Sequence, residues 1–69
     1  MKSKKRETAI SILESLSKLA STKETTYEIV PYAMGCMLFK NEKNITRETG
    51  EGFVAISKYL INIIAQTYE

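Results

Sequence analysis

The pattern of apolar and polar positions predicts a helix near each end of the chain. Between Lys5 and Ser21, apolar residues return every three or four positions, which places them on about one third of the circumference of an α-helix. The residues on this face are Ala9, Ile12, Leu13, Leu16, Leu19 and Ala20. Glu14, Lys18 and several serines occupy the opposite side, and Ile10 lies at the boundary. We therefore expect an amphipathic helix with one core-facing side.

The last predicted helix, from Phe53 to Tyr68, is apolar around most of its circumference. A surface helix ordinarily has an apolar arc of about 100° or slightly more. A chain of 69 residues has too small an interior to cover a wider arc, and large exposed apolar patches are rare on soluble monomers. We therefore expect a homodimer that forms through this helix. The interface candidates are Phe53, Ile56, Tyr59, Leu60, Ile61, Ile63, Ile64 and Tyr68.

The segment between these helices is compatible with two structures. Its β-branched and aromatic residues up to Val30 favour a strand, whereas the sequence Thr25-Thr26-Tyr27-Glu28 also matches a helix capping box. Pro31 fits the first turn of a helix, and the Met, Leu and Ala residues that follow it favour one. The prediction is therefore an all-α domain of three helices, in a homodimer with packed or intertwined helices. The alternative is an α+β fold with a central hairpin at residues 26–40 or a tight turn at residues 41–44.

Basic residues are concentrated at the N-terminus. Four of the ten Lys and Arg side chains lie in the first six positions, at Lys2, Lys4, Lys5 and Arg6. Six basic and eight acidic side chains remain, so the rest of the chain has a net charge of −2. This division predicts a basic arm at residues 1–6 and a single helical domain at residues 7–69. The four side chains of the arm are candidates for phosphate contacts, which would give a salt-sensitive attraction to nucleic acid.

The residue types that most often carry catalysis are missing from the sequence. It contains no histidine, no aspartate and one cysteine. This composition excludes the common general base, the usual catalytic triads and two-histidine metal motifs. Cys36 lies among apolar neighbours, as a buried core residue does, and no adjacent cation would activate its thiol. We therefore expect a protein that is not an enzyme and that binds neither a cofactor nor a metal.

The sequence also bears on where the chain acts. Charged residues interrupt the stretch in which a secretory signal would need an apolar core, and the apolar stretch within the last predicted helix is too short to span a membrane. A single cysteine suits a reducing compartment. The expectation is a cytoplasmic protein without a membrane partner.

Together these features predict a small non-catalytic binding protein that regulates or inhibits another protein by direct contact. Ile10, Met34 and Met37 are the candidates for the partner-binding surface, since methionine adapts to partners of different shape. The profile resembles that of small regulatory or inhibitory proteins of phage, plasmid or immunity type. The alternative is a DNA-binding regulatory or architectural protein in which the basic arm of each subunit contacts the DNA.

Overall fold

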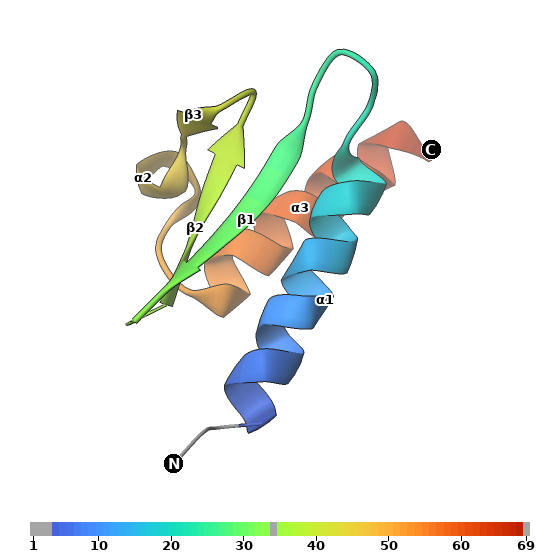
Figure 1. Cartoon of the computed structure of the whole chain (residues 1–69). Coiled ribbons are helices and arrows are strands. Elements are labelled where there is room, and N and C mark those ends of the chain that lie inside the picture. Colours follow the sequence, from blue (N-terminus) through green and yellow to red (C-terminus); the bar gives the residue numbers. More distant parts are fainter. Residues whose placement is uncertain (1–3, 34, 69) are drawn as a thin grey trace.

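The computed structural model describes residues 4–33 and 35–68, and it combines two long helices with a small antiparallel sheet (Figure 1). The elements follow the order α1 (Lys4–Ala20), β1 (Tyr27–Tyr32), β2 (Gly35–Lys40), β3 (Lys43–Asn44), α2 (Thr46–Thr49) and α3 (Phe53–Thr67). The strands lie side by side in the order β1-β2-β3. The two terminal helices are confirmed within one or two residues of their predicted ends.

The prediction of an all-α fold is wrong, because the middle segment forms the hairpin of the alternative α+β fold. Residues that could have continued a helix from Pro31 to Lys40 instead pair across two strands, with Ile29 opposite Leu38 and Val30 opposite Met37. Pro31 is tolerated because β1 is an edge strand, where a missing backbone N–H breaks no ladder hydrogen bond. The alternation of buried and exposed residues in β1 shows that a period of two governs this segment.

The connection between β2 and β3 is a tight turn at Asn41 and Glu42. Both residues have positive φ angles, 49° and 69°, as a two-residue turn requires when it matches the twist of antiparallel strands. The Asn41 side chain also accepts a hydrogen bond of 2.9 Å from the backbone N–H of Thr26, which ties the turn to the entry of β1. The predicted tight turn at residues 41–44 therefore coexists with the central hairpin.

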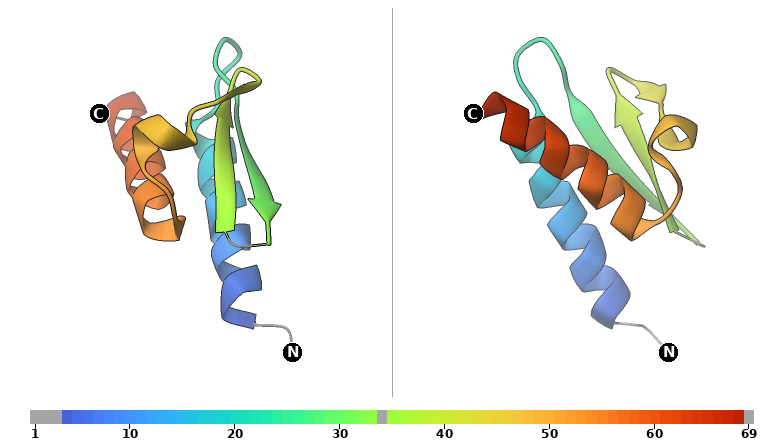
Figure 2. Two further views of the ribbon diagram at one scale, coloured as in Figure 1. Left: turned by 90° about the vertical axis from the view of Figure 1, so that its left-hand side faces the viewer. Right: turned by 180° about the vertical axis from the view of Figure 1, so that it is seen from behind.

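The sheet has one covered face and one open face. Both long helices lie against the same side of the sheet, with α1 next to β1 (Figure 2). Tyr27, Ile29, Cys36 and Leu38 point toward the helices and are buried. The opposite face carries Val30, Tyr32, Met37 and Phe39, which are half-buried or exposed, and we call these four residues the outer sheet face.

The outer edge of β1 is partly blocked by its own chain. The register turns the backbone groups of Tyr27, Ile29 and Pro31 away from β2. The Ser21 hydroxyl oxygen accepts a hydrogen bond of 2.9 Å from the N–H of Tyr27, and its hydrogen goes to the carbonyl of Ser17 at 2.7 Å. Pro31 has no N–H. The structure describes β1 in full, and within it Ile29 is therefore the residue whose N–H and C=O both point to this outer edge.

The core lies between the sheet and the two long helices. Its fully buried side chains are Leu13 from α1, Cys36 and Leu38 from β2, and Ile56 and Leu60 from α3. Tyr27 and Tyr59 close one end of it, with their rings edge to face and 6.4 Å between the ring centroids. Most of this core comes from segments far apart in the sequence, so the helices and the hairpin depend on one another for their stability.

Candidate functional site

An apolar strip runs along the helical side of the molecule. Ile12 and Leu19 are seven residues apart in α1, and Val54, Ile61 and Tyr68 are spaced by the same interval along α3. Residues seven apart share a face of a helix, and α1 packs against α3. All five side chains are between 51% and 70% exposed although they are large and apolar. We call these five residues the helical strip.

A shallow groove joins the two halves of the helical strip. It has a volume of about 180 Å³ and is lined by Ala9, Ile12, Leu13, Phe53, Val54 and Ser57. Ser57 is the polar residue of this lining, and its hydroxyl donates to the carbonyl of Val54 within the same helix. The groove therefore presents an almost wholly apolar surface, as the centre of a protein interface does.

The structure divides the predicted dimer-interface residues into two groups. Ile56 and Leu60 are fully buried, and Phe53, Tyr59, Ile63 and Ile64 pack against the core of the same chain. These six side chains therefore stabilise the fold of the chain itself. Ile61 and Tyr68 remain exposed and belong to the helical strip. The strip also includes Ile12, Leu19 and Val54, which the sequence pattern alone did not select as interface residues.

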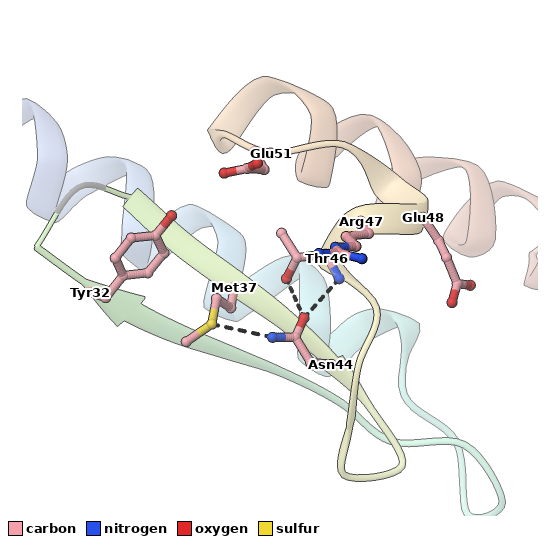
Figure 3. A pocket seen from close by; sticks show the side chains of 7 residues that line it. All are labelled: Tyr32, Met37, Asn44, Thr46, Arg47, Glu48 and Glu51. Atoms are coloured by element: carbon pink, nitrogen blue, oxygen red, sulfur yellow. Dashed lines mark hydrogen bonds between the residues drawn. The ribbon is translucent and has the colours of Figure 1, made fainter.

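Two of the predicted partner-surface residues, Ile10 and Met37, lie on different elements. Ile10 is half-buried on α1, and Met37 lies on the outer sheet face. Met34 lies outside the described residues. Met37 lines a groove of about 450 Å³ beside β2, which extends from Tyr32 at the end of β1 to the residues of α2 (Figure 3). This groove is lined by Tyr32, Met37, Asn44, Thr46, Arg47, Glu48 and Glu51, and we call it the β2 groove.

The floor of the β2 groove is held by a short chain of hydrogen bonds. The side-chain oxygen Oδ1 of Asn44 accepts hydrogen bonds from the backbone N–H and the hydroxyl of Thr46, at 2.9 and 2.6 Å. The same hydroxyl oxygen accepts a bond of 3.0 Å from the buried N–H of Leu38. Asn44 also donates to the sulfur of Met37. Thr46 thus continues the edge pairing of β2 at the point where β3 has ended.

Tyr32 is positioned by contacts at the end of the hairpin. A Cβ atom at Gly35 would lie 3.7 Å from the Tyr32 hydroxyl oxygen, so the ring extends across this glycine on the paired strand. The Arg6 side chain donates to the backbone carbonyls of both Tyr32 and Gly35 and fixes the same end of the hairpin. The ring therefore has a defined orientation while its side chain remains 39% exposed.

Glu51 reaches the β2 groove from the loop between α2 and α3. It stands between Gly50 and Gly52, whose φ angles of 92° and 102° lie in the region that favours glycine. A Cβ atom at Gly50 would also come within 3.1 Å of the Ala55 side chain. The two glycines therefore serve a tight connection that carries Glu51 outward. In Figure 3, the Glu51 carboxylate extends toward the side of the groove on which Tyr32 lies.

The predicted phosphate contacts fall on α1 or outside the described residues. Lys4 and Lys5 are exposed in the first turn of the helix. Arg6 is half-buried and bonded to the hairpin carbonyls, so its charge already has a role inside the fold. Lys2 lies outside the described residues. Sequence reasoning missed the structural role of Arg6, because its position in a basic run gave no sign of a contact 26 residues away.

The single cysteine is enclosed in the core. Cys36 is 1% exposed, and burial raises the pKa of its thiol, while the nearby charge of Arg6 acts more weakly in the opposite direction. The thiolate is the reactive form of cysteine, so both burial and protonation make this side chain inert in the folded protein. The pKa of Tyr27 is raised as well, first by burial and then by its neighbour Tyr59.

We expect the Cys36 thiol to be protected by folding. Labelling with an aromatic disulfide reagent at pH 8 should be on the order of 100-fold slower in the native protein than in urea, because reaction requires opening of the core. The sequence contains one cysteine, so the signal has a single source. Equal rates in the two states would contradict the burial of Cys36.

The burial of Cys36 also makes the free energy of unfolding depend on pH, and the sign of this dependence follows from the raised pKa. The folded form keeps the thiol proton at pH values at which an unfolded chain, with a cysteine pKa of about 8.5, has lost it. This contribution to the free energy of unfolding is therefore fully present below about pH 8.5 and declines as the pH rises above that value. Cys36→Ala should make the decline shallower in chemical denaturation measured across this range.

The described residues offer no metal site and no membrane-spanning helix. Across residues 4–33 and 35–68, no group of three His, Cys, Asp or Glu side chains could hold a metal ion. Within the same residues, each helix is too short or too polar to cross a lipid bilayer. Comparison of the chain with protein-family models, with curated proteins and with solved structures finds no match. Inferences about function therefore rest on the geometry of this chain.

Proposed function

We propose that this protein is a small non-catalytic binding protein that forms a homodimer through its helical strip and regulates or inhibits another protein by contact. The exposure of Ile12, Leu19, Val54, Ile61 and Tyr68 on one side of the molecule carries this proposal. Such side chains gain free energy when they leave water, at about 25 cal/mol for each Å² buried. An apolar surface rimmed by polar residues is typical of protein interfaces.

A second copy of the chain is the occupant that the helical strip favours. The five residues that define it carry no charge, so two strips can face each other about a two-fold axis without like-charge repulsion. Two-fold homodimers are the commonest soluble oligomers. Self-association on the helical side leaves the outer sheet face and the β2 groove accessible to a different protein. We expect the protein to act in the cytosol, where its lone thiol would stay reduced.

Replacing Ile61 with lysine tests the dimer directly. Ile61 is in the middle of the α3 part of the strip, and a two-fold interface would bring two new charges close together. At about 50 µM, analytical ultracentrifugation should give the wild type twice the mass of the 7.8 kDa chain, and Ile61→Lys the mass of one chain. The dissociation constant of the dimer should rise at least about 100-fold, as for other central interface residues.

Gln66→Lys provides the matched control. It adds the same charge to an exposed position of α3, but on a different side of the helix from Ile61. This variant should remain a dimer, and both variants should keep the circular dichroism spectrum of the wild type. A wild-type protein that stays monomeric up to about 1 mM would rule out the homodimer, because that concentration corresponds to only about 4 kcal/mol of binding free energy.

A further inference from the structure

The β2 groove combines an aromatic ring, the Met37 side chain and a carboxylate, and these groups suit one kind of side chain. We propose that the groove binds a segment of a partner protein through an arginine or lysine side chain, with the cation between the Tyr32 ring and the Glu51 carboxylate. This inference rests on the proposed function, in which the chain acts by binding another protein, and it names the chemistry of that partner.

The ring and the carboxylate supply the recognition of charge. A guanidinium or ammonium group is attracted to the face of an aromatic ring and forms strong hydrogen bonds with a carboxylate. Tyr32 is held across Gly35 with its ring partly exposed, and Glu51 extends toward it from a loop shaped by two glycines. Because the Tyr32 ring is already positioned, little conformational entropy of this side chain is lost when a ligand binds.

The floor of the groove suits the aliphatic part of the same side chain. Met37 lies between Tyr32 and Asn44 on the groove surface, and its sulfur is held by the Asn44 amide. Arginine and lysine both place their methylene groups against apolar surfaces while the charged end remains in a polar environment. The volume of about 450 Å³ lies within the range of small ligand sites, so the groove can accept a few residues of an extended chain.

The charges of the groove favour a basic protein segment over nucleic acid. Its lining contains two glutamates, Glu48 and Glu51, and one basic residue, Arg47. The hydrogen bonds drawn in Figure 3 join Met37, Asn44 and Thr46, and the Glu51 carboxylate extends into the groove beyond them. A phosphate backbone would meet a net negative charge here, whereas a cationic side chain meets a complementary one.

The test is a titration of ¹⁵N-labelled protein with two peptides that differ in one group. Acetyl-Val-Arg-Val-amide carries the guanidinium, and acetyl-Val-citrulline-Val-amide replaces it with an uncharged urea group of the same shape. The arginine peptide should shift the amide signals of Tyr32, Met37 and Glu51 at millimolar concentration, and the citrulline peptide should bind about fivefold to tenfold more weakly. Raising the salt concentration from about 20 to 300 mM should weaken the binding of the arginine peptide and leave that of the citrulline peptide unchanged.

Variants of the groove and of a distant carboxylate complete the experiment. Glu51→Gln and Tyr32→Leu should each weaken the binding of the arginine peptide about fivefold. The control variant Glu24→Gln, at an exposed position in the loop before β1, should bind this peptide with unchanged affinity. Equal binding of the two peptides, the absence of shifts at about 10 mM peptide, or shifts by a single-stranded oligonucleotide at the same residues instead would overturn the proposal. The dimer is tested separately by sedimentation, so Ile61→Lys should bind the arginine peptide as the wild type does.

Discussion

Leu60→Ala is expected to remove most of the stability of the fold. The Leu60 side chain is fully buried, in the core that α3 shares with the sheet and α1. A buried leucine replaced by alanine lowers the free energy of unfolding by about 2–5 kcal/mol, because apolar contacts are lost and a cavity remains. A domain of this size has about 3–10 kcal/mol in total. Urea denaturation followed by circular dichroism should therefore show a much lower midpoint, with a partly unfolded population before denaturant is added.

Leu19→Ala makes the same chemical change at a half-exposed position of α1. It should lower the free energy of unfolding by about 1 kcal/mol or less, since little cavity is created. The two variants should be compared below about 1 µM protein, so that self-association through the helical strip does not add to the measured stability. Similar losses for the two leucines would contradict the assignment of Leu60 to the core and of Leu19 to the surface.

Thr46→Val is expected to have the second largest effect, although valine has nearly the same shape as threonine. The Thr46 hydroxyl accepts the N–H of Leu38 at 3.0 Å and donates to Asn44 at 2.6 Å, and the residue is buried. Valine would leave the Leu38 N–H buried without a partner. Such a group costs about 1–3 kcal/mol, and the free energy of unfolding should fall by this amount.

Thr46→Ser distinguishes the contribution of the hydroxyl to stability from that of the methyl group. Serine keeps the acceptor for Leu38 and loses one buried methyl group, so its cost should be no more than about 1 kcal/mol. Amide hydrogen exchange gives a local measure of the same interaction: the Leu38 N–H should be protected in the wild type and in Thr46→Ser, and should exchange faster in Thr46→Val. A valine variant as stable as the serine variant would show that the hydroxyl contributes no stability at this position.

The terminal helices could be predicted from the sequence because each has a strong local period. The hairpin could not, because local signals in the middle segment conflict. The sequence from Thr25 to Glu28 matches a helix cap, and Pro31 suits the start of a helix as well as an edge strand. The choice is made by pairing across the chain, such as that of Ile29 with Leu38, and by burial against two helices that lie far away in the sequence.

The candidate surfaces depend on packing as well as on sequence. The excess of apolar residues on the last helix predicted that some need a partner, and in the single chain Ile61 and Tyr68 are exposed. Ile12 and Leu19 belong to the apolar face of α1 in the sequence, yet only the packing of α1 against α3 decides which part of that face stays in water. The β2 groove had no signal of its own, since Tyr32 and Glu51 come together only when the hairpin and the α2–α3 loop are in place.

The partly blocked edge of β1 limits how copies of this chain can associate through their sheets. A hydrophobic strand with an open edge can recruit further strands one after another, and the product is a fibre that grows without limit. Here Ser21 occupies the Tyr27 end and Pro31 has no group to donate at the other. On β2, the strand β3 and the Thr46 hydroxyl cover part of the other edge, and Cys36 is 1% exposed. Within β1, Ile29 alone offers both of its backbone groups to another strand, so growth by strand addition is disfavoured at this edge although the helices expose apolar side chains.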